Sequence, residues 1–295
     1  MYLICMKGYY NMDLTSPRTI RNIQEQFGFT FKKGLGQNFL TARNILEEIV
    51  DAAEIESGVI EVGPGFGVLT SELAQNSDKV VTIEIDERLI DVLDYTLAEY
   101  DNVKIINEDI LKLDLKKVID DEFKGEKVSI AANLPYYITT PIITKLLEEK
   151  LPIKNIVVMV QKEVAERMSA KPSTKDYGAI TVLCQYYTEP SIVANVPASL
   201  FVPPPKVDSA VLKLKILDKP SVEVKDEGVF FRVVKAAFSQ RRKTLLNCLS
   251  ANFPIPKDEI STLLESIGIA PSRRGETLSL KEFANIADTL LQKIK

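Results

Sequence analysis

The sequence contains no histidine, which limits the chemistry that the protein can perform. Without an imidazole there is no Ser-His-Asp or Cys-His site, no histidine metal cluster and no histidine general base. The three cysteines, Cys5, Cys184 and Cys248, lie far apart and form no CxxC pair, which argues against a zinc site. We therefore expect no metal, and any catalysis must use carboxylates, amides, hydroxyls, lysines, backbone groups or a cofactor.

Long hydrophobic runs are also missing. No apolar stretch reaches the roughly 18 residues needed to cross a bilayer, so we expect no membrane span. The opening segment 1–11 lacks the basic start and long apolar middle of a secretory signal, and we treat it as an extension of unknown role upstream of an alternative start at Met12. Scattered cysteines in odd number are typical of a reducing compartment, so we expect a cytoplasmic protein.

The formal net charge of −4 hides an uneven distribution. Residues 51–130 carry 20 acidic and 8 basic side chains, whereas the rest of the chain carries 29 basic and 21 acidic ones. A basic surface outside the acidic region would suit a polyanion. The alternative is an ordinary solvated, salt-bridged surface.

Short runs of β-branched residues alternate with helical stretches between about residues 41 and 165. The runs predict buried strands at 58–63, 79–85, 102–107, 127–133 and 154–161. The stretches between them predict helices at 41–54, with Thr41 as the N-cap, and at 66–77, 87–100 and 140–150. This alternation predicts right-handed βαβ units and a mainly parallel sheet, that is, a Rossmann-like α/β fold.

The pattern changes after the triple proline at 203–205. The segment 209–217 alternates like a half-exposed strand, and the chain beyond Pro220 is helical in character. We therefore predict a Rossmann-like catalytic domain at 12–217 and a small helical C-terminal domain at 218–295.

Three glycines in VIEVGPGFGVLT (59–70) mark a tight turn between a strand and a helix. Gly63, Gly65 and Gly67 allow the backbone to approach a ligand where a Cβ would clash. The spacing is G-x-G-x-G, and Val68 stands where the dinucleotide fingerprint needs a further glycine. The turn is therefore either a structural turn or the cradle of a different ligand.

Acidic residues follow at the ends of the next two predicted strands. Glu84 lies 21 residues after Gly63, where a carboxylate can accept hydrogen bonds from ribose hydroxyls. Asp109 ends the third strand and could address an adenine amine. Either acid alone could be an ordinary strand end, but glycines, Glu and Asp at three consecutive strand ends predict a nucleoside-containing cofactor.

The stretch AANLPYY (131–137) places an amide, a proline and two tyrosines at the end of a predicted strand. Asn133 and Tyr136 would project where open α/β sheets bind their ligands. The alternative is a loop in which Pro135 ends the strand and the tyrosines fill the core.

Eight short motifs follow one another along the chain in an order typical of one protein family. They are GLGQNFL (34–40), EVGPGFGVLT (61–70), EID (84–86), ED (108–109), NLPYYITTP (133–141), VQKEVAERM (160–168), FVPPPKVDSAV (201–211) and FSQRRKTLLN (238–247). Together they resemble the ribosomal RNA adenine dimethyltransferases, most closely the KsgA type, over about residues 16–295.

This resemblance implies an S-adenosylmethionine-dependent enzyme of small-subunit ribosome biogenesis. It would dimethylate the N6 amines of two adjacent adenosines near the 3′ end of small-subunit (16S) rRNA. Its partners would be the 3′-terminal rRNA hairpin and the immature small ribosomal subunit, and we expect a monomer.

The resemblance also implies roles for individual residues. Asn38 and Leu40 would cover the cofactor, with Gln37 as a weaker candidate. The remaining cofactor contacts are implied at Gly63 for the methionine portion, Glu84 for the ribose, Asp109 for the adenine and Asn133 between the methyl group and the target base.

The NLPYY stretch would then activate and hold the target adenine. The side-chain carbonyl of Asn133 and the backbone carbonyl of Leu134 could accept hydrogen bonds from the exocyclic amine and aim its lone pair at the methyl group. Tyr136 would stack on the extruded base, and Phe201 would close the other side of the pocket unless it is simply a core residue.

RNA binding would fall to the basic residues outside the acidic region, through the forked donors of arginine. The candidates form three clusters: Lys32 and Lys33, then Arg241, Arg242 and Lys243, then Arg273 and Arg274. Each cluster alone could be a solvated face.

Other functions remain open at this stage. The antibiotic-resistance methyltransferases of large-subunit rRNA share the glycine turn and the Asn-x-Pro-aromatic motif, and DNA adenine methyltransferases share the target amine. A non-enzymatic assembly factor, or a relative that acts like a mitochondrial transcription factor, is the alternative outside enzymes.

Overall fold

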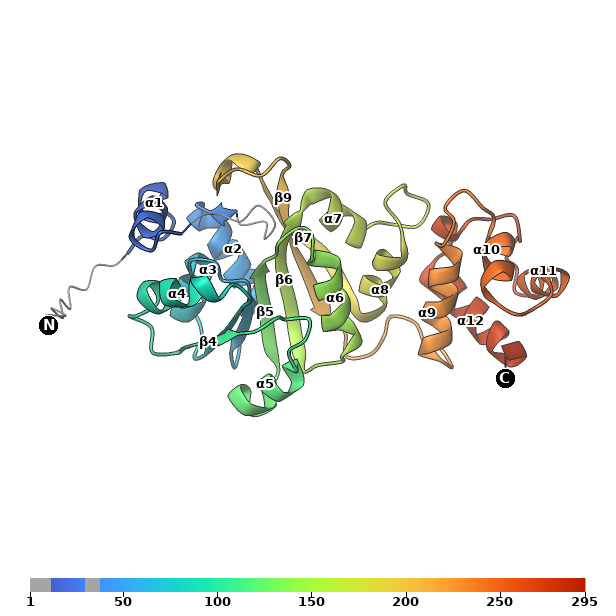
Figure 1. The fold of residues 1–295 in the computed structure, drawn as a ribbon. Coiled ribbons are helices and arrows are strands. Elements are labelled where there is room, and N and C mark those ends of the chain that lie inside the picture. Colours follow the sequence, from blue (N-terminus) through green and yellow to red (C-terminus); the bar gives the residue numbers. More distant parts are fainter. Residues whose placement is uncertain (1–11, 30–37, 295) are drawn as a thin grey trace, which may run out of the picture. The chain divides into compact units, whose positions relative to one another are not determined.

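The computed structural model describes residues 12–29 and 38–294 of the chain (Figure 1). The extension 1–11 and the predicted site residues Lys32, Lys33 and Gln37 lie outside the described residues.

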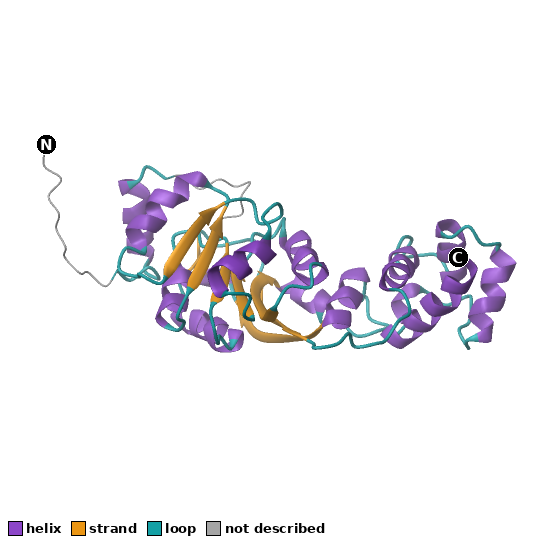
Figure 2. Ribbon diagram, turned by 90° about the horizontal axis from the view of Figure 1, so that it is seen from below, coloured by secondary structure: helices purple, strands orange, loops and turns teal. Residues whose placement is uncertain are grey.

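A seven-stranded sheet forms the centre of the fold, and helices flank its strands (Figure 2). In spatial order the strands are β4 (Val103–Asn107), β3 (Val80–Glu84), β2 (Val59–Val62), β5 (Val128–Asn133), β6 (Ile153–Gln161), β9 (Ser209–Ile216) and β7 (Thr188–Val196). The five strands from β4 to β6 pair in parallel. Every residue of β2 and β3 is buried, as expected for parallel strands that are covered on both faces.

The sheet confirms the Rossmann-like α/β fold predicted from the sequence. The chain runs outward from β2 through β3 to β4 and then returns to place β5 on the other side of β2. The strand order therefore reverses between β2 and β5. In open α/β sheets, ligands bind at such a switch point, outside the carboxyl ends of the strands.

Helices connect the parallel strands and cover the sheet. They are α2 (Arg43–Ala53), which precedes β2, α3 (Val68–Gln75), the short helix Glu87–Leu89 continued by α4 (Ile90–Thr96), α5 (Leu115–Phe123) and α6 (Thr139–Glu148). A further helix, α1 (Pro17–Gln26), stands at the start of the described chain.

Thr41 does not cap α2, contrary to the sequence prediction. The N-cap is Ala42, without a side-chain cap. The Thr41 hydroxyl instead donates to the carbonyl of Leu200 at 2.9 Å, beside a two-stranded sheet of β1 (Phe39–Leu40) and β8 (Phe201–Val202). The hydrogen bond to Leu200, 159 residues away in the sequence, therefore takes the place of the predicted N-cap bond of Thr41.

The remaining described elements are mainly helical. They are α7 (Lys162–Met168), α8 (Ala179–Tyr187), a short helix at Ala198–Leu200, α9 (Glu227–Ala237), α10 (Leu245–Asn252), α11 (Lys257–Ser266), a short helix at Gly275–Thr277 and α12 (Leu280–Ile294).

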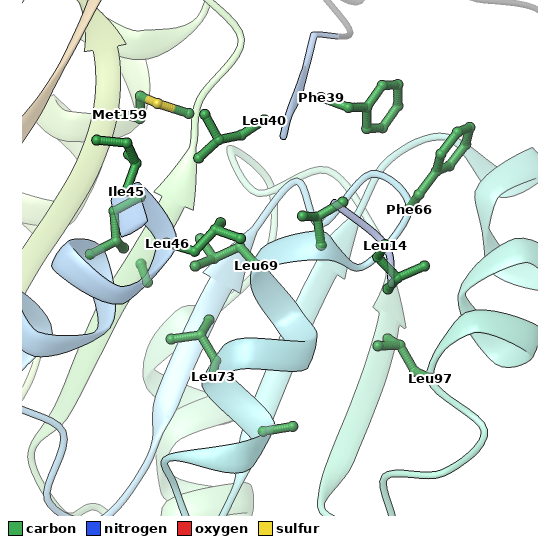
Figure 3. Close-up of a cluster of buried hydrophobic side chains, with 14 of the residues drawn as sticks. Leu14, Phe39, Leu40, Ile45, Leu46, Phe66, Leu69, Leu73, Leu97 and Met159 are labelled. Carbon is green, nitrogen blue, oxygen red and sulfur yellow. The ribbon is translucent and has the colours of Figure 1, made fainter. Parts of the chain in front are cut away.

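The contacts divide the chain into two compact units. The first contains the described residues up to Lys162 together with Val193–Lys213, and the second contains Glu163–Ile192 together with the described residues from Leu214 onward. Each unit has its own buried apolar cluster: Figure 3 shows side chains of the first cluster, including Phe39, Phe66 and Leu73, and the second cluster includes Phe230 and Phe283.

Candidate active site

The glycine turn joins the end of β2 to the start of α3. Gly63, Gly65 and Gly67 all have positive φ, at 72°, 59° and 84°, which residues other than glycine rarely adopt. A Cβ on Gly65 would lie 2.7 Å from the ring of Phe39. A Cβ on Gly63 would meet nothing within 4 Å, so its main chain is open to a ligand.

A cleft lies at the switch point of the sheet, and we call it the switch-point cleft. The predicted cofactor-binding residues that line it are Asn38, Leu40, Gly63, Glu84, Asp109 and Asn133. They come from β1 and its entry, from the turn after β2, and from the ends of β3, β4 and β5. The fold therefore gathers in one cleft six residues that are spread over almost one hundred positions of the chain.

Two acidic side chains of this cleft are buried. Glu84 is 6% exposed, and its Oε1 accepts a hydrogen bond from the backbone of Asp86 at 2.8 Å. Burial raises the pKa of Glu84, while backbone hydrogen bonds from Asp86 and Gly65 oppose that shift.

Glu61, in the middle of β2, is a cleft residue that the sequence analysis missed. It is 1% exposed, and burial raises its pKa to about 8, although a 2.5 Å hydrogen bond from the Thr70 hydroxyl lowers it and nearby Glu84 adds to the rise. An acid inside a fully apolar strand was the signal in the sequence that could have identified it.

Asp109 stands just beyond the end of β4 at the rim of the cleft. Its Oδ1 accepts a hydrogen bond from the backbone of Leu111 at 3.0 Å. Lys112 approaches the other carboxylate oxygen only to 3.9 Å and is itself well exposed, so this ion pair is weak.

Asn133 is the last residue of β5, and its amide is held in one orientation. Its Nδ2 donates to the backbone carbonyl of Asn38 at 3.0 Å. The opposite atom, Oδ1, accepts no hydrogen bond from the described residues. The amide therefore offers a free acceptor at the cleft, and the turn behind it is tied to β6 by a 3.1 Å bond from Leu134 N to the Met159 carbonyl.

The other predicted catalytic residues are not part of the cleft lining. Leu134 is 2% exposed, and Phe201 is 3% exposed within the buried cluster, where it pairs across β1 and β8 with Leu40. Tyr136 is half-buried, and its hydroxyl lies 2.8 Å from the Ser209 hydroxyl. Tyr137, which the sequence analysis did not single out, lines the cleft and is 58% exposed.

The predicted RNA-binding residues in the second unit differ in their surroundings. The guanidinium of Arg273 makes intramolecular contacts: it forms an ion pair with Glu282 and donates to the Thr277 carbonyl at 2.6 Å. Arg241 donates to the carbonyl of Lys175. Arg242, Lys243 and Arg274 are exposed and form no ion pair with any described residue.

Within the described part of the chain, no helix is both long and apolar enough to cross a bilayer.

The sheet and the switch-point cleft define the class of protein. A parallel sheet, a glycine turn open to a ligand and a buried carboxylate at the next strand end belong to Rossmann-like proteins that bind a nucleoside-containing cofactor.

Comparisons with known proteins then identify the family. The family model for ribosomal RNA adenine dimethylase matches residues 28–292. A relative named ribosomal RNA small subunit methyltransferase A, from Bacillus mycoides (strain KBAB4), is 54% identical over 285 residues, which cover 95% of this chain and 98% of that relative. The chain belongs to the ribosomal RNA adenine dimethylase family.

Two solved structures agree with this assignment. A dimethyladenosine transferase from Plasmodium falciparum is 30% identical, with a TM-score of 0.70 over 84% of this chain and 95% of that one. The 23S rRNA methyltransferase ErmE is 27% identical, with a TM-score of 0.66 over 86% of this chain and 100% of that one.

The resemblance inferred from the sequence motifs is thereby confirmed. The chain is a methyltransferase that uses S-adenosylmethionine to dimethylate adenine in ribosomal RNA, and it acts in the biogenesis of the small ribosomal subunit.

Proposed function

We propose that the chain dimethylates two adjacent adenosines in the 3′-terminal hairpin of small-subunit rRNA, and that it acts as a monomer on the immature subunit in the cytoplasm. The observation that carries the methyl-transfer step is the orientation of Asn133, which lines the switch-point cleft and whose Oδ1 accepts no hydrogen bond from the described residues.

The switch-point cleft fits S-adenosylmethionine. Gly63 leaves open main chain where the methionine portion would lie, the buried Glu84 would hold the ribose, and Asp109 would face the adenine. Asn38 and Leu40 would cover the bound cofactor from the side of β1. When bound, the cofactor supplies an electrophilic methyl group on a positively charged sulfur.

Asn133 would activate the target amine. The exocyclic nitrogen of adenine is a poor nucleophile because its lone pair is delocalised into the ring. Hydrogen bonds from that nitrogen to Asn133 Oδ1 and to the Leu134 carbonyl would turn the lone pair toward the methyl group. Alignment then provides most of the rate, and no histidine base is needed.

Tyr136 and Phe201 would hold the extruded base. A tyrosine face contributes roughly 1–3 kcal/mol of stacking per base. Phe201 is buried and is the register partner of Leu40 in the β1–β8 pair, so we assign it the support of the pocket wall.

The exposed basic residues would bind phosphates of the rRNA. Arg242, Lys243 and Arg274 are the best candidates, because they are exposed and not committed to ion pairs with described residues. Arg241 could still contribute, whereas Arg273 would act mainly by holding its segment. Lys32 and Lys33 remain predictions from the sequence. For domain organisation we retain catalytic residues 12–217 and an RNA-binding region 218–295.

The test is to incubate the protein with labelled S-adenosylmethionine and, in parallel reactions, with unmethylated small subunits and with large subunits, and to map modified adenines by primer extension. We expect two adjacent dimethyladenosines near the 3′ end. Label confined to large-subunit RNA would instead assign the chain the activity named for ErmE.

Asn133→Asp sharpens this test. Aspartate cannot donate to the Asn38 carbonyl, so the carboxylate should turn away and methyl transfer should fall by about 100-fold or more. The matched control is Asn102→Asp, since the Asn102 amide also donates to backbone carbonyls, at 2.8 Å to Ala74 and Ser77, but lies away from the cleft. Full transfer by Asn133→Asp would refute the proposed role of the amide.

A further inference from the structure

The motif FVPPPKVDSAV contains a serine to which the proposed function gives no role. Ser209 is completely buried at the first position of β9. Its hydroxyl lies 2.8 Å from the hydroxyl of Tyr136, a contact between two segments 73 residues apart. This is the one polar contact of the Tyr136 side chain with the described residues.

The Ser209 side of this contact is held firmly. Asp208, the preceding residue, accepts a hydrogen bond from Ala198 N on its carboxylate at 2.9 Å. Its carbonyl accepts another from Lys162 N at 3.0 Å. With β9 inside the seven-stranded sheet, Ser209 has little freedom to move.

On the Tyr136 side, the other hydrogen bonds of the turn involve its backbone and not the Tyr136 ring. The turn is closed by a 3.2 Å bond from Ile138 N to the Pro135 carbonyl, and the Thr139 hydroxyl donates to the same carbonyl. Neither bond restrains the ring. Burial raises the pKa of Tyr136, so its hydroxyl remains protonated at neutral pH and can donate.

We propose that Ser209 is a positioning residue that holds the Tyr136 ring in the orientation needed to stack on the target adenine. This inference rests on the proposed function, in which Tyr136 receives the base. A stacking face must be presented at a defined angle, and a hydroxyl anchored in the sheet restrains the far end of the ring.

The test is a double-mutant cycle with Ser209→Ala and Tyr136→Phe, measured as methyl transfer to unmethylated small subunits. Each single variant should lower kcat/KM by about threefold to tenfold, as expected for one hydrogen bond. The double variant should be no worse than either single variant, because both changes remove the same contact.

Two measurements separate positioning from a general loss of structure. The affinity for S-adenosylhomocysteine should be unchanged, since neither residue lines the switch-point cleft. Ser129→Ala is the matched control: Ser129 is 2% exposed, its hydroxyl donates to the Ala53 carbonyl at 2.6 Å, and it lies at the opposite end of β5 from Asn133. This control should lose stability without losing transfer.

Tyr136→Ala distinguishes failure of this inference from failure of the role proposed for Tyr136, whereas absence of methyl transfer by the wild-type protein would overturn the proposed function itself. If Tyr136→Ala loses transfer while Ser209→Ala keeps the wild-type kcat/KM, the role of Ser209 is wrong and that of Tyr136 stands. Additive losses in the double variant would also overturn the inference. If Tyr136→Ala retains full transfer, the ring does not receive the base, and the roles proposed for Tyr136 and for Ser209 are both wrong.

Discussion

Glu61 shows how one residue can belong to a site and yet be unfavourable for the fold. Its carboxyl group lies within β2 at 1% exposure, beside Glu84, and only the Thr70 hydroxyl offers it a hydrogen bond in the described structure. A charge there is poorly solvated, so the side chain is protonated near neutral pH. Two neighbouring carboxylates can thus line the switch-point cleft without both carrying charge.

This burial makes stability depend on pH. Below about pH 4.5 the Glu61 carboxyl is protonated in both the folded and the unfolded protein. Between about pH 4.5 and 8 it releases its proton only in the unfolded chain. The free energy of unfolding should therefore fall as the pH rises through this range.

Glu61→Gln should remove that fall, because glutamine does not titrate. We expect the variant to gain stability relative to the wild type between pH 5 and 8, measured by urea denaturation. Glu47→Gln, at an exposed position of α2, is the control and should follow the wild type. Parallel curves for Glu61→Gln and wild type would contradict the raised pKa.

At the scale of elements, the turn after β2 and the short strand β1 depend on each other. Phe39 of β1 stacks on Phe66 of the turn, with ring centroids 4.2 Å apart (Figure 3). Gly65 permits this approach because it has no side chain to meet the Phe39 ring. The lining of the cleft therefore includes a segment that is itself paired with β8.

Gly65→Ala should disturb this arrangement in two ways. The new Cβ would lie 2.7 Å from the Phe39 ring, and alanine is strained at a φ of 59°. We expect the affinity for S-adenosylhomocysteine, measured by calorimetry, to fall about tenfold or more. Gly178→Ala is the control, since Gly178 has an extended backbone and a Cβ there would meet no atom within 4 Å. Equal affinities of the two variants would show that the turn tolerates a side chain.

At the scale of the whole molecule, each of the two units contains a buried apolar cluster of described residues. Every residue that lines the switch-point cleft belongs to the first unit. The exposed arginines proposed for RNA binding belong to the second. A substitution that lowers the stability of the second unit should therefore leave the affinity for the cofactor unchanged.

Phe283→Ala tests this separation. Phe283 is fully buried in the second cluster, and its truncation should cost about 3–5 kcal/mol of that unit's stability. Cofactor affinity below the unfolding temperature should remain at the wild-type value. Leu73→Ala, in the buried cluster of the first unit, is the comparison and should weaken binding as well. A matching loss of affinity in Phe283→Ala would show that the units are coupled.

Much of the cofactor cleft could be predicted from the sequence alone. β-branched runs identify buried strands, positive φ at Gly63 is a local requirement, and parallel strands bring their carboxyl ends to one edge whatever their exact order. Glu84, Asp109 and Asn133 were therefore predictable as neighbours once the strands were placed, whereas Asn38 was implied only by the resemblance to the family.

Only the tertiary structure decided how individual side chains are used. The Thr41 hydroxyl donates a hydrogen bond to the Leu200 carbonyl, and Arg273 forms an ion pair with Glu282. Of the two adjacent tyrosines, Tyr137 lines the cleft, whereas the Tyr136 hydroxyl contacts Ser209. These outcomes depend on contacts between distant segments, or on the direction in which a turn leaves its strand. Local sequence carries the periodicity of a strand and the backbone freedom of a glycine, but it does not carry the identity of the neighbour that packing supplies.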